Sequence, residues 1–217
     1  MPSSSWRQLI RQNTRLLPMI WAMTLLFSAL GVTLVIQGPP AVPPAHWPNR
    51  TVILVWIDPS DAPPGADALV ERAMTTWTKA AGGHFTLEKT ATRNAALVRV
   101  GFVGGDANYG ETRPRIDRRT GTIGEADVHI NREVAGDALN RRIILYLTAL
   151  HELGHALGLP HSDDFTTIMY SFRRPDDGER YFRAYRQRLR SIDDIGSAQA
   201  TGLAPGDLVA LRVLYGQ

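Results

Sequence analysis

The stretch HELGHALGLPH, residues 151–161, holds three of the six histidines of the chain. His151 and His155 are four residues apart, so on a helix they lie on one face, about one turn from each other. Neutral imidazoles are good zinc ligands, and two at this spacing can bind a single ion. Glu152 lies beside the first histidine and can reach a water at that ion without binding the metal itself. The pattern therefore predicts a zinc site with a carboxylate next to it.

Gly158 and Pro160 indicate how a third histidine can reach the same ion. A helix that continued past Gly158 would carry His161 away from the first two ligands. Glycine accepts the left-handed conformation that ends a helix, and proline prevents the helix from resuming. We therefore predict that the turn brings His161 back as the third ligand. Three protein ligands leave a fourth tetrahedral position open for water, as in catalytic zinc sites.

The helix that must position these ligands is predicted to begin at Asp137, a suitable N-cap, and to continue without a breaker to Gly158. Upstream, a β-branched apolar run predicts a buried strand, and a 3.6-residue repeat before Gly82-Gly83 predicts a helix. Three further strands are expected, with a loop before the last. In chain order these elements are strand 51–57, helix 66–81, strands 84–88 and 97–103, loop 104–121 and strand 122–131.

The last of these strands alternates between an apolar and a polar face. Ala126, Val128 and Ile130 lie on one face, and charged or polar side chains lie on the other. We predict a half-exposed strand near an edge of the sheet. The whole order predicts an α+β fold, a mixed twisted sheet with two long helices.

The N-terminal region predicts a membrane segment. Residues 16–36 carry no charge and would span about 31 Å as a helix, which matches a bilayer core. Arg7, Arg11 and Arg15 precede the segment, and no Lys or Arg follows before Arg50. The positive-inside rule predicts a cytoplasmic tail over 1–15, a transmembrane signal anchor over 16–36 and the rest of the chain outside the cell membrane.

A cleaved signal peptide is the alternative, and it would give a secreted protein. Ala29-Leu30-Gly31 is a possible cleavage site, but cutting there would leave an apolar stretch on the mature protein. Residues 37–48 hold five prolines and are expected to form an extended linker. A single domain over 49–217 follows.

Composition excludes several kinds of chemistry. The chain has no cysteine, which excludes disulfides, thiolate ligands and a thiol nucleophile. Its net charge of +3, from 24 basic and 21 acidic residues, is too small to indicate nucleic-acid binding without a recognisable module, so no nucleic-acid partner is expected.

The motif HExxHxxGxxH at residues 151–161 resembles the zinc signature of the metzincin metalloproteases. Met169 in TTIMY fits the methionine turn of that group, and the segment from Asp207 to Gly216 looks like the closing helix of its matrixin branch. The resemblance implies a matrixin-like catalytic domain with a small C-terminal subdomain that holds both features. It also implies that Met169 forms the floor of the zinc site without binding the ion.

The activity that the resemblance implies is that of a zinc-dependent endopeptidase, which the predicted segment 16–36 would anchor in the membrane. Glu152 would act as general base on a zinc-activated water, and protein or peptide substrates would be the partners. An extended substrate would pair with the strand around Ile123, Ala126 and Val128. The alternative is an exported zinc-binding module that binds a protein partner without catalysis.

Two features depart from the matrixin pattern. Only Asp127 and His129 fall near the positions of the second zinc of many matrixins, so one catalytic zinc is expected, without a second zinc or calcium. Residues 173–190 carry seven arginines against three acidic residues. This segment is either a specificity loop or a patch for anionic lipid or an acidic partner, or simply a solvated helix.

Overall fold

The computed structural model of this protein describes residues 44–105 and 108–216. Its central element is a five-stranded sheet. The strand order is β2-β1-β3-β5-β4; the first four are parallel and β4 runs antiparallel to β5. The strands are β1 (Thr51–Ile57), β2 (Phe85–Lys89), β3 (Val98–Val103), β4 (Gly110–Asp117) and β5 (Thr122–Asn131). The mixed sheet that the sequence predicts is confirmed.

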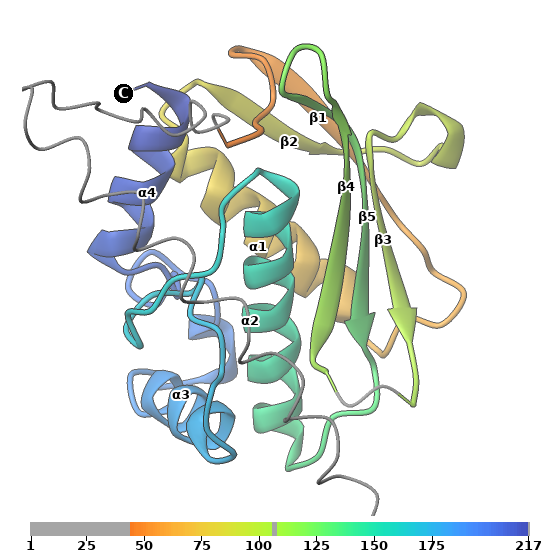
Figure 1. Cartoon of the computed structure of the whole chain (residues 1–217). Coiled ribbons are helices and arrows are strands. Elements are labelled where there is room, and N and C mark those ends of the chain that lie inside the picture. The colour runs from red at the N-terminus through yellow and green to blue at the C-terminus, as the bar shows by residue number, and fades with distance from the viewer. Residues whose placement is uncertain (1–43, 106–107, 217) are drawn as a thin grey trace, which may run out of the picture. The chain divides into compact units, whose positions relative to one another are not determined.

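Two long helices, α1 (Ala66–Ala80) and α2 (Ala138–Ala156), lie side by side on one face of the sheet (Figure 1). Strands β1, β2, β3 and β5 direct alternate apolar side chains toward them; Ile53, Val55 and Ile57 of β1 are buried in this way. The indole of Trp77 joins the two helices, since its Nε1 donates to the carbonyl oxygen of Leu150 at 2.8 Å. Packing against the sheet and α1 therefore fixes the position of α2 along its axis and its rotation about that axis.

The opposite face of the sheet is polar. Arg99 and Arg115 lie on either side of Glu125 and Asp127, with nitrogen–oxygen distances of 2.9 to 3.4 Å. This ladder of ion pairs crosses β3, β5 and β4. The acidic residues that the sequence placed on one side of strand 122–131 are thus paired, and no helix within residues 44–105 and 108–216 covers this face (Figure 1).

Strand β4 corrects one prediction. Residues 104–121 were predicted to be a loop, but Gly110–Asp117 form an edge strand. Strand 122–131 was predicted to be half-exposed and near an edge, and β5 lies next to the edge strand, between β3 and β4, and pairs with both. The sequence of β4, GETRPRID, has almost no apolar residue, because both of its faces are largely exposed, so it lacks the alternation that identifies strands.

The C-terminal part covers α2 on the side away from the sheet. It contains α3 (Asp177–Arg186) and α4 (Pro205–Tyr215), joined by a long connection. Two buried tyrosines fix this connection: the hydroxyl of Tyr146 donates to the carbonyl oxygen of Thr201, and that of Tyr185 to that of Ala200. The closing helix expected after the methionine turn is α4.

The predicted membrane segment, residues 16–36, lies outside the described residues, as do the predicted tail and most of the linker. Across 44–105 and 108–216, no helix is both long and apolar enough to cross a bilayer.

Candidate active site

Helix α2 carries the first part of the site and is fixed at both ends. Asp137 is its N-cap and accepts a hydrogen bond from the backbone N–H of Asn140 at 2.8 Å, as the sequence predicts. At the other end, Trp47 donates to the carbonyl oxygen of Ala156, and Tyr215 donates to that of Leu157. These bonds satisfy carbonyls that a helix end leaves without partners.

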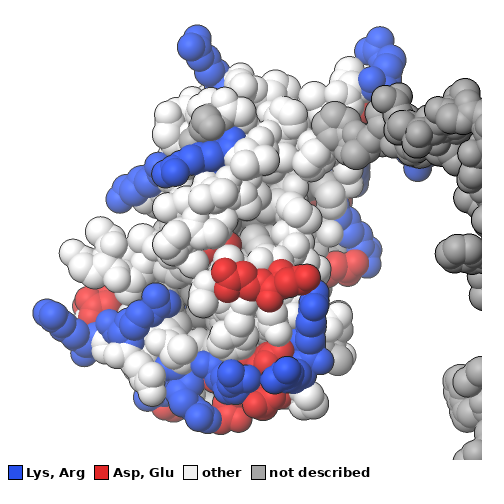
Figure 2. All heavy atoms as spheres, turned by 60° about the vertical axis from the view of Figure 1, so that its left-hand side comes forward, with Lys and Arg blue, Asp and Glu red and all other residues white. Residues whose placement is uncertain are grey.

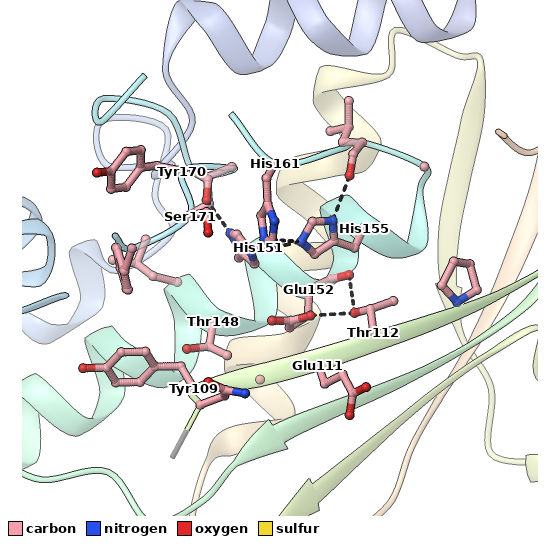
Figure 3. A pocket seen from close by; sticks show the side chains of 18 of the residues that line it. Tyr109, Glu111, Thr112, Thr148, His151, Glu152, His155, His161, Tyr170 and Ser171 are labelled. Carbon is pink, nitrogen blue, oxygen red and sulfur yellow. Dashed lines mark hydrogen bonds between the residues drawn. The ribbon is translucent and has the colours of Figure 1, made fainter. Parts of the chain in front are cut away.

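Three imidazoles meet at the last turns of this helix. The Nε2 atom of His155 lies 3.1 Å from Nε2 of His151 and 3.0 Å from Nε2 of His161 (Figure 3). A tetrahedral zinc ion with bonds of about 2.0–2.1 Å separates its ligand nitrogens by about 3.3 Å. In the part of the chain that the structure describes, these residues are the one group of three or more His, Asp or Glu placed to hold a metal ion.

Hydrogen bonds fix which nitrogen of each ring faces inward. Nδ1 of His151 lies 2.6 Å from the carbonyl oxygen of Ile168, and Nδ1 of His155 lies 2.8 Å from that of Leu159. Because a carbonyl oxygen only accepts, both Nδ1 atoms carry the hydrogen and both Nε2 atoms present lone pairs. Two lone pairs that face each other at 3.1 Å repel unless a cation lies between them. The site therefore fits a zinc ion held by His151, His155 and His161.

The close packing of the three imidazoles predicts how the stability of the metal-free protein depends on pH. Burial and the neighbouring His155 lower the pKa of His151 from 6.5 to about 4. Between these values the unfolded chain binds a proton at His151 that the folded chain does not, so the contribution of His151 to stability falls as the pH falls from about 6.5 toward 4. We expect the thermal midpoint of metal-free His151→Gln to rise relative to that of the metal-free wild type as the pH falls across this range.

Gly158 makes the turn that returns His161 to the other ligands. Its φ of 99° lies in the left-handed region, and a Cβ atom there would lie 2.0 Å from the carbonyl oxygen of Ala45. Glycine is thus required both by the backbone conformation and by the passage of the N-terminal segment beside it.

We expect Gly158→Ala to destabilise the protein by about 2 kcal/mol or more, since left-handed strain is joined by a backbone clash. Gly83→Ala is the matched control, because Gly83 has a φ of 95° and nothing within 4 Å of its Cβ position. Urea unfolding of both variants measures the difference. Equal loss of stability in the two would show that the contact with Ala45 has no effect.

Glu152 lies on the cleft side of α2 with only 5% of its surface exposed. Burial raises the pKa of its carboxyl group to about 7, and a hydrogen bond from the hydroxyl of Thr112 opposes this shift. The hydroxyl is 2.7 Å from Oε2 of Glu152 (Figure 3). A carboxyl group with a pKa near neutrality can both accept and release a proton at physiological pH.

Met169 is buried and packs against α2 inside the histidine motif. Its sulfur would be 2.5 Å from a Cβ atom on Gly154, so the glycine inside the motif lets the methionine pack directly against α2. The methionine turn is held by Asp207 at the start of α4. This carboxylate is buried and accepts hydrogen bonds from the backbone N–H groups of Ile168 at 2.9 Å and Ala204 at 2.8 Å, with Met169 N at 3.4 Å.

Asp207→Asn should therefore destabilise the protein by about 2–3 kcal/mol, because an amide cannot accept all of these bonds and buries a donor against them. Asp193→Asn is the control, since Asp193 lies exposed on a short 3₁₀ helix. The free energy of unfolding in urea measures both effects. A loss within about 0.5 kcal/mol of the control would contradict the role of Asp207.

A cleft of about 710 Å³ opens in front of the histidines. An aromatic wall closes its side toward α3: the ring of Tyr109, which precedes β4, meets Phe182 with centroids 5.0 Å apart and Phe172 with centroids 5.9 Å apart. Gly178 of α3 leaves room for the Tyr109 hydroxyl, which lies 3.0 Å from its Cβ position. The segment after Met169 thus contributes to the wall of the cleft.

The predicted substrate strand is wrong. Ile123, Ala126 and Val128 are buried beneath α2, at most 2% exposed, and the backbone of β5 already pairs with strands on both sides. The strand with a free edge beside the cleft is β4, whose residues Gly110, Glu111 and Thr112 line it. Sequence reasoning missed Gly110, Thr112, Gly154 and Asp207, of which only Gly154 lies inside a recognisable motif.

The arginine-rich segment forms α3 and its flanks, and most of its charges are neutralised locally. Arg180 pairs with Asp177 and Arg186 with Asp137, while Arg173 and Arg183 pair with Asp163 and Glu179. In the lower part of the face shown in Figure 2, basic and acidic side chains lie next to one another. This arrangement favours the solvated helix over an anion-binding patch.

Comparison with known proteins agrees with this geometry. The family model of the matrixins matches residues 57–195, which include the three histidines, Glu152 and Met169. The chain belongs to the matrixin family. The metzincin resemblance that residues 151–169 indicate is confirmed.

Individual relatives are similar over part of their length. The chain is 31% identical to rabbit interstitial collagenase over 113 residues, 48% of this chain and 23% of the collagenase. It is 29% identical to rat matrilysin over 147 residues, 62% of this chain and 53% of matrilysin. It is also 29% identical to the metalloendoproteinase 2-MMP of Arabidopsis thaliana over 142 residues, 58% of this chain and 36% of that protein. This matrixin thus spans a quarter to a half of these relatives.

Proposed function

We propose that this matrixin is a zinc-dependent endopeptidase that cleaves extended peptide segments. The observation that carries the proposal is the meeting of three Nε2 atoms, with that of His155 3.0–3.1 Å from the other two, beside a buried carboxylate in an open cleft. Zinc in this position would polarise a peptide carbonyl and lower the pKa of a water toward about 7.

The residues of the chain supply the proton transfer and the seating of the substrate. A carboxylate oxygen of Glu152 takes the proton of the attacking water and then delivers it to the leaving amine. The free edge of β4 pairs with the backbone of an extended peptide, which gives register with little demand on side-chain identity. The aromatic wall of Tyr109, Phe172 and Phe182 favours apolar side chains next to the cut.

The test is incubation of the purified full-length chain with a diverse peptide library, followed by mass spectrometry of the new termini. We expect cleavage with an apolar preference beside the cut, absent in the presence of a chelator. Intact peptides at every condition, with zinc bound to the protein, would favour the alternative of a zinc-binding interaction module. The presence of the Glu152 carboxylate beside the histidines supports a peptidase over a binding module, because metal binding alone does not need that carboxylate.

We also propose that residues 16–36 anchor the protein in the cell membrane, with the N-terminus in the cytoplasm and the zinc site outside. Support comes from the sequence, in which 21 uncharged residues follow Arg7, Arg11 and Arg15. Carbonate extraction of membranes and mass spectrometry of the mature N-terminus test this. A mature protein that begins after residue 31 and is found in the medium would instead support secretion.

A further inference from the structure

The edge strand beside the cleft makes contact with the carboxylate of Glu152 at two of its residues. The hydroxyl of Thr112 lies 2.7 Å from Oε2 of Glu152 and 2.9 Å from the backbone carbonyl oxygen of the same residue. Both of these oxygens are acceptors when Glu152 is ionised, so the threonine hydroxyl is the donor and its single hydrogen is shared between them. One side chain on β4 therefore touches Glu152 at both its backbone and its carboxylate (Figure 3).

Gly110 lies two residues earlier on the same face of β4. It restricts the position of the second carboxylate oxygen of Glu152, the one that Thr112 does not contact. A Cβ atom at Gly110 would lie 2.8 Å from both Cγ and Oε1 of Glu152, and 2.9 Å from Cγ2 of Thr148. The bare backbone of Gly110 is thus packed against the Glu152 side chain. One carboxylate oxygen is held by a hydrogen bond and the other by close packing.

From this arrangement we infer that Thr112 is a positioning residue that holds the Glu152 carboxylate in the orientation needed for proton transfer, with Gly110 providing the space for it. The inference rests on the proposed peptidase function and goes beyond it, because it assigns part of the catalytic geometry to the strand that receives the substrate. A general base must lie within hydrogen-bonding reach of the proton it takes, and a flexible glutamate has several rotamers that fail this condition.

The surroundings of Thr112 argue against a purely structural role for its hydroxyl. Thr112 lies on the face of β4 that is turned toward α2, whereas its neighbours Glu111 and Arg113 lie on the opposite face and pair with each other. The hydrogen bonds of its hydroxyl to Glu152 reach both the backbone and the side chain of that residue. A hydroxyl that served only to stabilise the strand would not need to reach the side chain of this particular residue.

The experiment compares Thr112→Val, which keeps the shape of the side chain but removes the hydroxyl, with Thr112→Ser, which keeps the hydroxyl. We expect Thr112→Val to lower kcat for a peptide substrate by about 10- to 100-fold, a part of the about 10²–10⁴-fold that a positioned general base supplies. KM, zinc content and thermal midpoint should change little, because substrate and metal binding are retained. Thr112→Ser should recover most of kcat. Thr86→Val, on the far edge strand β2, is the matched control.

Crystal structures of metal-free Thr112→Val and Thr112→Ser give a readout that does not depend on activity. We expect a displaced or multiple Glu152 side chain in the valine variant and a single conformer in the serine variant. An active wild type with kcat and Glu152 unchanged in Thr112→Val would overturn the inference and leave the proposed function standing. A wild type that cleaves nothing would overturn the peptidase proposal and, with it, the catalytic meaning of the contact.

Discussion

Glu152→Gln is expected to lower kcat for peptide hydrolysis by about 10²–10⁴-fold while the protein keeps its zinc. Glutamine has the shape of glutamate and can still pair with the Thr112 hydroxyl, but it cannot take a proton from water. The three histidines are untouched. Turnover of a fluorogenic peptide and the zinc content of the purified variant measure the two quantities.

The same substitution should not weaken the fold. Burial raises the pKa of Glu152 to about 7 from its ordinary value of 4.5, so the ionised carboxylate opposes folding progressively as the pH rises between these values. A neutral glutamine removes that effect, and metal-free Glu152→Gln should unfold at or above the wild-type temperature at pH 8. Glu88→Gln, at an exposed position of β2, is the control. Wild-type kcat in Glu152→Gln would refute its role as general base.

Removal of zinc is expected to abolish peptide cleavage and to lower the thermal midpoint, with both recovered when one equivalent of zinc is returned. A ligand that binds only the folded state stabilises it by about 2.7 kcal/mol when its free concentration is 100 times its dissociation constant. The three-histidine site exists only when the turn at Gly158 is formed, so zinc should bind the folded chain selectively. Calorimetry with and without a chelator measures the shift.

Two histidine variants define which residues hold the ion. His161→Gln should lower the zinc content and remove most of the zinc-dependent stabilisation. His129→Gln should change neither, because the imidazole of His129 lies on β5 outside the cluster of the other three. Full zinc content in His161→Gln, or its loss in His129→Gln, would contradict the ligand assignment.

The parts of the fold that sequence predicts well are those in which local pattern and tertiary environment agree. Helix α2 combines a capping aspartate, an apolar stripe and a glycine stop, and its bounds follow from them. The histidine site could be predicted because all of its ligands lie within 11 residues of one another. Only the turn at Gly158 had to be inferred, and the chemistry of glycine fixes that turn.

The parts that sequence did not reveal depend on contacts between distant segments. The exposed strand β4 has no apolar face, so nothing in its own residues distinguishes it from a loop; it forms because β5 offers an unpaired edge. The contact between Thr112 and Glu152 joins residues 40 positions apart. The buried carboxylate of Asp207 likewise reaches a turn 38 and 39 residues upstream. Contacts of this kind leave no periodic signal in a single sequence.

Strand β4 also bears on how the protein behaves toward copies of itself. An open strand edge invites other chains to add to the sheet, and unprotected edges lead to aggregation. Here Pro114 removes one backbone donor. Glu111, Arg113 and Arg115 form ion pairs that the approach of a second copy of the chain would have to desolvate. In the proposed function, the edge admits an extended peptide at its Gly110 end, while its charged remainder opposes the addition of a second copy of the chain.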